Sequence, residues 1–580
     1  MDVIGFKEAK CKNCYKCVRV CNVKAIEVKD EQAQIINDKC ILCGQCLEAC
    51  PQNAKTFISD LDKVKDYIRR GIPTVVSVAP SYMGILNYRV PGQVFSALRK
   101  LGFSQVRETA EGAAFVTAEY DRLLAEKKME NIITTCCPSM NELVEIYYPE
   151  LTKYLAPVVS PMIAHGKLIK KEQGDSVKVV FLGPCIAKKR EAENDRRTSG
   201  YIDAVINFNE FEGWLAEKKI EIMECGDELP DNRNAAVNRL YPVSGGILSS
   251  VLACAGIAAA EDGKEKETYK KFYVHGIESC MDLLENMKRG EISGCFIEAD
   301  ICSGGCLKGS AMENRGKSHF QARLEMEDAV EKRWVEEGYL DQGRTVSMAR
   351  TFADRSDKSS MPGEEEIRRI LKKIGKVNKE DELNCSACGY STCRDKAIAV
   401  YHGNAELTMC LPYMNEKAQS MANVVLDTTP NIVVIVDSDM KIIEFSNAAV
   451  SYFKKTKAQA REMYLFELID HTDFEYVLNT RTSILGKKVC YPDLGITTLQ
   501  NIVYIKDQNC VLGTMQDITE DEDKIRQSQK LKFETIEMAQ KVIDKQMMVA
   551  QEIAGLLGET TAETKVTLTK LRDMIINDGN

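Results

Sequence analysis

Residues 11–21 read CKNCYKCVRVC and residues 40–50 read CILCGQCLEAC. Both stretches have the spacing C-x2-C-x2-C-x3-C, in which three cysteines bind one cubane iron–sulfur cluster and the fourth crosses to a second cluster. Two tandem motifs of this form favour iron over a zinc site, which is the alternative for closely spaced thiolates. The motifs predict a two-cluster unit over residues 1–60, in which one 4Fe-4S cluster is bound by Cys11, Cys14, Cys17 and Cys50 and the other by Cys40, Cys43, Cys46 and Cys21.

Length and charge limit the classes of protein that this chain can belong to. A soft prior of about 150 residues per domain divides its 580 residues into about four domains. The net charge of -9 offers no basic surface for nucleic acid. The longest apolar run, near residues 251–260, is shorter than the roughly 18 residues that span a membrane, and no signal-peptide pattern precedes the first motif. We therefore expect a cytoplasmic protein without nucleic-acid or membrane partners.

A third group of cysteines, with the spacing C-x2-C-x4-C-x16-C, lies in residues 379–415. Disulfides are disfavoured in the cytosol, so clustered cysteines there usually bind metal. Buried free thiols are the alternative reading, which suits scattered cysteines such as Cys225, Cys280, Cys490 and Cys510. We predict a third 4Fe-4S site, which resembles a small domain of anaerobic redox and signalling proteins; a structural zinc remains open. Its ligands would be Cys385, Cys388, Cys393 and Cys410.

Between these groups, residues 61–353 alternate between apolar runs and amphipathic stretches. The runs IPTVVSVAP (72–80), ENIITTCCP (130–138), KVVFLGP (178–184) and SGCFIEADI (293–301) predict strands. The stretches PGQVFSALRKLG (91–102) and TAEYDRLLAEKK (117–128) predict helices. This alternation indicates an α/β domain with a substantially parallel sheet, whose strand ends are the common place for a site.

Three segments of this domain carry four further cysteines near predicted strand ends. They are TTCCPSM (134–140), FLGPCIAKKREAE (181–193) and FIEADICSGGCLKG (296–309). A cubane needs four thiolates, and strand ends can supply them from distant parts of the chain. The segments offer Cys137, Cys185, Cys302 and Cys306.

The three segments closely resemble the H-cluster signatures of the iron-iron (FeFe) hydrogenases, and the likeness extends over about residues 1–345, including a bacterial-type ferredoxin unit. The resemblance implies that the four cysteines hold a 4Fe-4S cubane, that Cys306 also bridges to a two-iron unit, and that Pro80 lies at this cofactor. The unit would carry carbon monoxide, cyanide and azadithiolate, and maturation proteins would install it. Reversible oxidation of H2 to protons is the implied chemistry, with the protein positioning and tuning the cofactor.

The same resemblance assigns roles to five residues around the implied two-iron unit. Lys188 and Ser81 match the residues that contact its cyanide ligands. Cys136 matches the thiol that relays protons, and Ser160 and Glu191 match later members of that relay. A surface salt bridge is the alternative role for Lys188 and Glu191.

Departures from the family pattern indicate slow or retuned turnover. Gly183 and Asp300 stand where highly active members place methionines beside the two-iron unit. The acidic pair that completes the family's proton path falls near Glu119 and Tyr120, where only one carboxylate is obvious.

The C-terminal part predicts a linker and helix over residues 354–378, a sensor domain over 416–522 and a long helix over 523–580. Residues 426–456 and VLGTMQDITE (511–520) resemble a PAS domain, an α+β fold; a generic α+β module is the alternative. The last helix has an apolar seam that predicts a coiled coil and a homodimer, although one helix packed on its own domain would show the same pattern. The seam comprises Ile536, Ala539, Ile543, Ala550, Ile553 and Leu557, with Gln546 as a polar interruption.

Three functions fit this organisation. The first is a hydrogen or redox sensor that signals through the PAS domain and terminal helix to a partner such as a kinase or phosphatase. The second is a metabolic hydrogenase subunit that exchanges electrons with a ferredoxin-like partner. The third is a non-catalytic, hydrogenase-like iron–sulfur assembly protein, against which Lys188, Ser81 and Cys136 argue.

Overall fold

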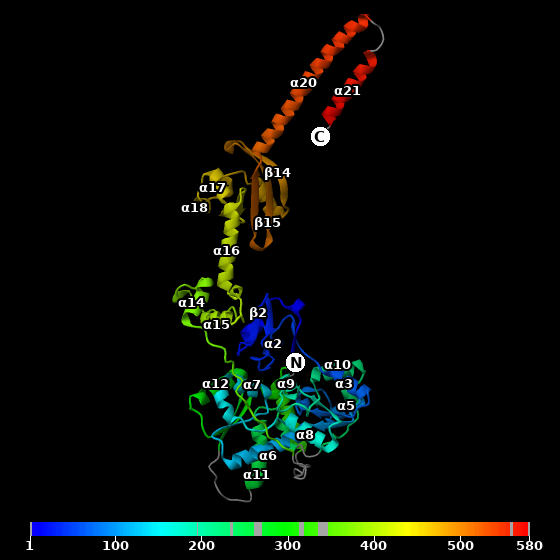
Figure 1. Ribbon diagram of the computed structural model, residues 1–580, viewed down its shortest axis with the longest axis vertical. Helices are drawn as coiled ribbons and strands as arrows, with labels where there is room; N and C mark the ends of the chain where they lie inside the picture. The colour runs from blue at the N-terminus through cyan, green and yellow to red at the C-terminus, as the bar shows by residue number, and fades with distance from the viewer. Residues whose placement is uncertain are drawn as a thin grey trace. The chain divides into compact units, whose positions relative to one another are not determined.

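The computed structural model describes residues 3–193, 195–232, 236–259, 269–311, 318–333, 346–556 and 561–577. The chain divides into two compact units, Met1–Tyr413 and Met414–Asn580. The first unit holds all of the cysteine groups singled out above, and the second holds the predicted sensor domain and terminal helix (Figure 1).

The N-terminal part of the first unit has one short antiparallel strand pair near its ends and another between its two cysteine motifs. Strand β1 (Ile4–Phe6) pairs antiparallel with β4 (Lys55–Phe57), and β2 (Ile26–Lys29) pairs antiparallel with β3 (Gln32–Ile35). A short helix lies inside each motif, α1 (Lys16–Val20) and α2 (Gln45–Glu48). Both helices start after a residue with positive φ, Tyr15 at 55° and Gly44 at 79°, and this sharp reversal folds each motif back on itself.

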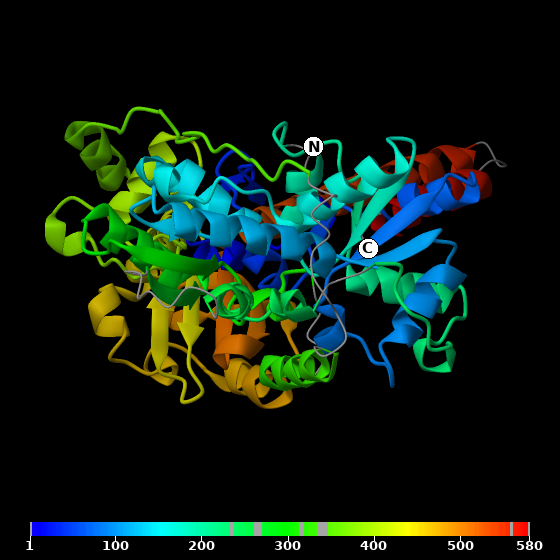
Figure 2. The same cartoon turned by 90° about the horizontal axis from the view of Figure 1, so that it is seen from below.

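The α/β domain contains a four-stranded parallel sheet with the order β6-β5-β8-β9. Its strands are β5 (Thr74–Val78), β6 (Gln105–Glu108), β8 (Lys178–Leu182) and β9 (Ala204–Ile206). The helices that accompany it are α3 (Leu61–Arg69), α5 (Gly92–Lys100), α6 (Ala110–Glu126), α8 (Pro161–Gln173), α9 (Ala187–Glu193) and α10 (Phe208–Glu217). Figure 2 views this domain from below. Strand β5 is buried along its whole length, as its continuous apolar run predicts.

A second parallel sheet has three strands in the order β10-β11-β7. They are β7 (Ile132–Ile133), β10 (Lys270–His275) and β11 (Cys295–Asp300). Helices α4 (Tyr82–Ile85), α7 (Pro138–Tyr147), α11 (Gly246–Ala259), α12 (Ile277–Lys288) and α13 (His319–Arg333) complete the domain. The prediction of a mixed α/β domain with parallel strands is therefore confirmed. Among the described residues, no helix is both long and apolar enough to cross a membrane.

The third cysteine group has a small core of its own. Helix α14 (Glu364–Lys373), predicted from its amphipathic pattern, packs with α15 (Cys393–Tyr401) through Ile367, Ile370 and Ala397. Thr392 caps α15 by accepting a hydrogen bond from the backbone N–H of Asp395. The cap fixes the start of the helix, which carries Cys393 at its first position.

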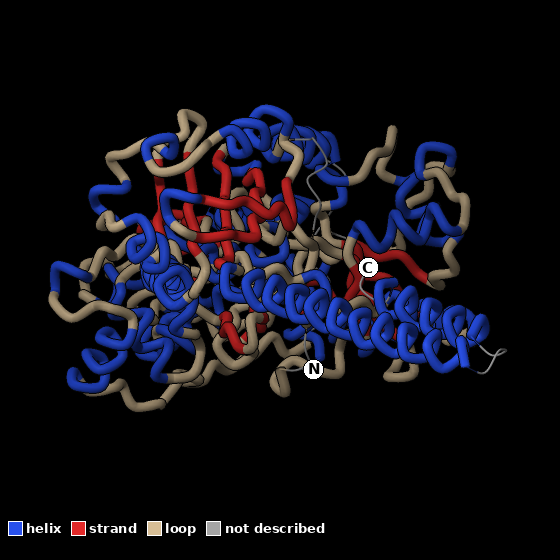
Figure 3. The backbone as a smooth tube through the Cα atoms, turned by 90° about the horizontal axis from the view of Figure 1, so that it is seen from above, coloured by secondary structure: helices blue, strands red, loops and turns tan. Residues whose placement is uncertain are grey.

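The second unit contains a five-stranded antiparallel sheet with the order β13-β12-β16-β15-β14 (Figure 3). The strands are β12 (Ile432–Val436), β13 (Ile442–Phe445), β14 (Ile484–Tyr491), β15 (Ile496–Ile505) and β16 (Cys510–Asp517). Helices α17 (Asn447–Phe453), α18 (Lys457–Ala460) and α19 (Thr472–Thr480) lie between β13 and β14 in the chain. Helix α16 (Leu411–Thr428) starts directly after Cys410 and leads into this unit.

The C-terminal helical region differs from the single long helix that the sequence predicts. It consists of α20 (Thr519–Leu556) and α21 (Thr561–Asn577), which lie side by side in Figures 1 and 3. Of the predicted seam, Ile536, Ile543 and Ala550 are half-buried and Ala539 is exposed, whereas Leu557 lies outside the described residues. The chain therefore supplies an intramolecular neighbour for α20, which pattern analysis of one helix cannot reveal.

Close packing of α6 on α8 positions two segments that matter for the site, because α6 carries Tyr120 and α8 starts after Ser160. A Cβ atom at Gly112 of α6 would lie 2.7 Å from the Cβ atom of His165 in α8. Real Cβ contacts are not this short, so a side chain at position 112 would push the two helices apart.

We predict that Gly112→Ala lowers the free energy of unfolding by about 1–3 kcal/mol, the usual cost of overpacking. Chemical denaturation followed by circular dichroism measures the change. Gly213→Ala is the matched control, because it also lies in a helix but a Cβ atom there meets nothing within 4 Å. A neutral or stabilising effect of Gly112→Ala would contradict the packing argument.

Candidate functional site

The four cysteines of the α/β domain come together from three separate loops. Cys137 immediately precedes α7, with Pro138 at the first helical position. Cys185 lies in the turn between β8 and α9, and Cys302 and Cys306 follow β11. Hydrogen bonds join these loops: the backbone N–H of Ala311 donates to the carbonyl oxygen of Pro184 at 3.1 Å, and Lys188 Nζ donates to the carbonyl oxygen of Cys136 at 3.0 Å.

Burial governs the protonation of these four thiols. It raises the pKa of Cys137 to about 12, and it raises the pKa values of Cys185, Cys302 and Cys306 as well. Their mutual repulsion adds to this effect. The four thiols would not ionise together at neutral pH without a strong cationic partner, which an iron cluster supplies on binding.

Ser81 provides an independent test of whether a further group fits here. Its side chain is fully buried, and among the described residues its hydroxyl oxygen has no hydrogen-bond partner. An unsatisfied buried hydroxyl costs about 1–3 kcal/mol, so such an atom calls for a partner outside the chain. The sequence resemblance implies that a cyanide ligand is this partner, and any bound group that accepts a hydrogen bond would satisfy the hydroxyl.

The predicted relay residues Ser160 and Glu191 are in direct contact. The Ser160 hydroxyl donates to Glu191 Oε2 at 3.0 Å, and Lys188 Nζ donates to the same oxygen at 2.8 Å. Arg350 Nη1 donates to the other oxygen, Glu191 Oε1, at 2.7 Å. Lys188 Nζ also donates to the carbonyl oxygen of Cys136 at 3.0 Å, so one ammonium ties the predicted relay thiol segment to Glu191.

The next predicted relay position is occupied by a phenol. Tyr120 is fully buried, and its hydroxyl lies 3.3 Å from Cys136 Sγ. It also accepts a hydrogen bond from the backbone N–H of Thr135 at 3.0 Å. Glu119, its neighbour in sequence, forms an ion pair with Arg122 at 2.8 Å instead. Of Glu119 and Tyr120, it is Tyr120 whose side chain contacts the Cys136 thiol in the described part of the chain.

The absence of a side chain at position 183 has a steric cause. A Cβ atom on Gly183 would lie 2.5–2.6 Å from the ring of Phe181 and 3.2 Å from the Cβ atom of Ala79. The Phe181 ring thus fills space that a methionine at position 183 would need. The sequence suggests that glycine removes bulk, and the structure shows that a neighbouring aromatic ring restores it.

Asp300, the other departure, ends strand β11 in a buried position. Burial raises the pKa of its carboxyl and favours the neutral form. Burial and the charge of Asp300 also raise the pKa of Glu298, although the Glu298 carboxyl accepts hydrogen bonds from the backbone N–H groups of Gly245 (2.7 Å) and Leu248 (2.9 Å) at the start of α11. Two buried acids therefore lie on the strand that leads to Cys302.

The ferredoxin unit brings together one of its predicted ligand sets in a single cavity. Cys21, Cys40, Cys43 and Cys46, called the inner set, line this cavity, including the cysteine predicted to cross between motifs. The remaining set, Cys11, Cys14, Cys17 and Cys50, is called the outer set. Within it, burial raises the pKa of Cys17, although the nearby Lys55 ammonium opposes this shift. Backbone hydrogen bonds and Lys55 lower the pKa of Cys50.

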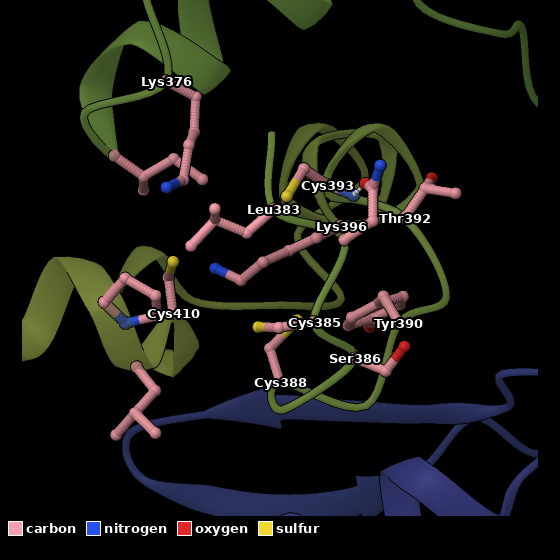
Figure 4. Close-up of a pocket in the computed structure, with 14 residues that line it drawn as sticks. Lys376, Leu383, Cys385, Ser386, Cys388, Tyr390, Thr392, Cys393, Lys396 and Cys410 are labelled. Atoms are coloured by element: carbon pink, nitrogen blue, oxygen red, sulfur yellow. Dashed lines mark hydrogen bonds between the residues drawn. The ribbon is translucent and has the colours of Figure 1, made fainter. Parts of the chain in front are cut away.

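The third set, Cys385, Cys388, Cys393 and Cys410, lines one cavity together with Lys396 (Figure 4). The Lys396 side chain is only 2% exposed and runs into the space among the cysteines. Its ammonium donates to the carbonyl oxygens of Glu406 at 2.8 Å and Leu407 at 3.1 Å. Lys396 thereby fixes the turn that presents Cys410 and places a positive charge beside the thiols.

The described part of the chain contains no group of three or more His, Cys, Asp or Glu side chains arranged to hold a single metal ion. The donor chemistry of the cysteine sets, four soft sulfur atoms each, suits 4Fe-4S clusters.

Sequence reasoning missed four residues of these sites: Phe181, Arg350, Lys396 and, as a contact of Cys136, Tyr120. Arg350 lies 159 positions from its partner Glu191, so no local spacing signals the pair. Lys396 follows Cys393 by three positions on α15, a spacing that places both on one face of the helix. Of the four missed residues, Lys396 is the one that such a spacing in the sequence could have revealed.

Three family models match regions of the chain that carry the cysteine sets. The family model for the C-terminal domain of the iron-only hydrogenase large subunit matches residues 72–310. A 4Fe-4S dicluster domain matches residues 10–54, and an Fe-S cluster domain matches residues 381–412.

Among relatives, iron hydrogenase 1 of Clostridium pasteurianum is 27% identical over 49% of this chain, and the match spans 65% of that relative, less than two thirds of its length. The cytosolic Fe-S cluster assembly factor narfl of Danio rerio is 25% identical over 40% of this chain and 71% of its own length. The solved FeFe hydrogenase HydA1 from Chlamydomonas reinhardtii is 18% identical, with a TM-score of 0.40, over 52% of this chain and 100% of that chain.

The protein thus contains an FeFe hydrogenase-like large-subunit domain preceded by a 4Fe-4S ferredoxin motif. Its relatives include both hydrogenases and cytosolic iron–sulfur assembly factors.

We predict that Gly183→Met destabilises the domain by about 1–3 kcal/mol, because the new side chain overlaps the Phe181 ring. Phe181→Ala should relieve this clash, so the double variant should be more stable than the sum of the single effects implies. The double-mutant cycle is measured by chemical denaturation, with iron content as a check on the site. Additive effects would show that Phe181 does not limit the space at position 183.

Proposed function

We propose that the protein is a hydrogen-reactive FeFe hydrogenase with low or retuned turnover, which acts as a sensor of H2 or redox state. The observation that carries this proposal is the match of residues 72–310 to the hydrogenase large-subunit domain, which contains the four cysteines that suit a cubane; the buried Ser81 hydroxyl, which has no partner among the described residues, adds to it. When bound, the two-iron unit would supply an iron site for hydrogen and an amine base. Cysteine sets alone would also suit an assembly protein, whereas Ser81 calls for a polar ligand beyond the cubane.

The chain's own residues would hold this cofactor and move protons to and from it. Cys137, Cys185, Cys302 and Cys306 would bind the cubane, and Ser81 and Lys188 would donate hydrogen bonds to cyanide. Lys188 is held near the site by Glu191 and by the carbonyl oxygen of Cys136. Cys136 would carry the proton, with Tyr120 on one side of it and the contact of Ser160 with Glu191 as the family-type continuation.

The proposed change in turnover follows from the residues at and beside positions 183 and 300, where active family members have methionine. Phe181 is rigid and aromatic where a flexible thioether is expected, and Asp300 is a buried carboxyl. A buried acid near the cubane changes the local electrostatics more than a thioether does. These differences favour a sensory role over rapid turnover.

We also propose that the second unit transmits the signal to a partner protein. Its five-stranded antiparallel sheet and the sequence resemblance support a PAS domain, and α20 with α21 would contact a signalling partner or a second copy of the chain. Exposed apolar side chains on α20 include Leu531, Met538, Val542 and Val549. Such a surface on a helix is suited to protein–protein contact.

A second candidate is favoured by one specific observation. The chain matches a cytosolic iron–sulfur assembly factor over 71% of that relative, a larger share than it matches of the hydrogenase. An assembly protein would need the cubanes and would not need the two-iron unit. Infrared spectroscopy distinguishes the two candidates, because bound carbon monoxide and cyanide absorb where protein does not.

We predict that anaerobically matured protein shows carbon monoxide and cyanide bands and oxidises H2, and that Cys136→Ala keeps its iron content. The variant should lose most of the H2 oxidation rate, since a positioned proton-transfer group contributes roughly 10²–10⁴-fold. Cys225→Ala is the control, because Cys225 is also buried and belongs to none of the sets. Absence of cyanide bands would favour the assembly function, and full activity of Cys136→Ala would exclude this thiol from the proton path.

We also predict that removing residues 414–580 leaves H2 oxidation largely intact, because the chain divides into compact units at this position. The shortened protein should lose self-association and regulation of its partner. Solution mass and H2 oxidation rate of the full and shortened chains test this. Loss of H2 oxidation on truncation, or a full chain that is monomeric in every redox state, would be evidence against the modular sensor.

A further inference from the structure

We propose that the third cluster exchanges electrons directly with the cluster of the inner set, across a contact between the Cys388 loop and the Cys21 end of α1. The inference rests on the proposed function in one respect, that both sets hold 4Fe-4S clusters. It adds a branch to the electron path, in which the inner cluster serves both the α/β site and the third cluster.

The contact is closest at Gly389, which directly follows Cys388. Gly389 has a φ of +92°, and a Cβ atom there would lie 2.8 Å from Val18 Cγ1 and 3.1 Å from the backbone nitrogen of Arg19. Glycine is required on both counts, backbone conformation and space. The loop that carries Cys388 is therefore seated on α1 backbone to backbone.

Two cations fasten the same contact. Lys24 Nζ donates to the carbonyl oxygen of Gly389 at 2.6 Å and to that of Val18 at 3.3 Å. Arg19 donates to the carbonyl oxygen of Ala387 at 3.1 Å and to that of Cys14 at 3.0 Å. The two cations thus join the residues on either side of Cys388 to the first ferredoxin motif.

Cys21 of the inner set and Cys388 of the third set share the same neighbours. Cys388 packs against the apolar core that contains Cys21 and Val18. Tyr390 is 4% exposed and belongs to the same core. One apolar core therefore extends from the inner set to the third set.

The inner set also adjoins the segments that carry the cysteines of the α/β domain. Ser139, two residues after Cys137, donates to the carbonyl oxygen of Leu42 at 3.3 Å. Arg190 donates to the carbonyl oxygen of Cys40 at 2.7 Å. A Cβ atom on Gly44 would lie 3.3 Å from Ile186, the residue after Cys185. The inner set therefore has contacts toward both other sites.

The redox step is a one-electron transfer without movement of atoms. One electron leaves the reduced inner cluster, which returns to its oxidised form, and enters the oxidised third cluster. Since α16 starts directly after Cys410, the acceptor is covalently continuous with the helix that leads to the second unit. The outer cluster is not needed on this route.

The test uses the full chain with its clusters, reduced by dithionite, so that it needs no reaction with H2. Pulsed electron paramagnetic resonance measures the magnetic interaction of the reduced third cluster with a neighbouring reduced cluster. We expect this interaction in the wild type and its loss in the double variant Arg19→Met, Lys24→Met. Lys12→Met, Lys16→Met is the control, because it removes the same charge from exposed lysines of the same unit.

A further variant identifies the partner cluster. Cys14→Ala removes a ligand of the outer set only, so the interaction of the third cluster should persist in it. Its loss there would assign the partner role to the outer cluster and overturn the proposal, as would its absence from the wild type or zinc in place of iron at the third site. If the double variant loses iron, the proposal is tested by comparing the wild type with Cys14→Ala. Lack of H2 oxidation would refute the proposed function and leave this result standing.

Discussion

Burial of four thiols from three loops is the constraint on which the rest of the α/β domain depends. Cys137, Cys185, Cys302 and Cys306 carry raised pKa values because burial disfavours their charged forms. A cluster of iron would stabilise those charges, and the two parallel sheets supply the strand ends that bring the loops together. Metal binding and folding of this region are therefore thermodynamically linked.

At Glu191 and at the third cysteine set, each buried charge pairs with a nearby opposite charge or with backbone carbonyl groups. Lys188 and Arg350 hold the two oxygens of Glu191, and Lys396 donates to two backbone carbonyls beside the third set. Breaking such a pair leaves an uncompensated buried charge, which is far more costly than losing a surface ion pair. Each of these cations also fixes a segment that carries a cysteine or a predicted relay residue, so one side chain both balances charge and positions its neighbours.

Gly183 and Asp300, the two departures from the family pattern, have different physical effects. Gly183 is compensated locally by the ring of Phe181, so its effect is to replace a flexible side chain with a rigid one. Asp300 places a buried carboxyl at the end of strand β11, which also carries Glu298. The first change is mainly steric and the second mainly electrostatic, and a sensor would use both to slow a reaction without losing its cofactor.

The cysteine sets, the alternation of strands and helices and the hydrogenase-like signatures can be predicted from the sequence alone, because ligand spacing and periodicity are local properties of a chain. The sequence also points to Ser160 and Glu191, which the fold brings into hydrogen-bond contact. Four contacts become visible in the three-dimensional fold and not before: Phe181 fills the space at Gly183, Arg350 holds Glu191, α21 packs beside α20, and the Cys388 loop is seated on α1. These contacts join residues far apart in sequence, and they depend on side-chain volume and burial that no spacing rule encodes.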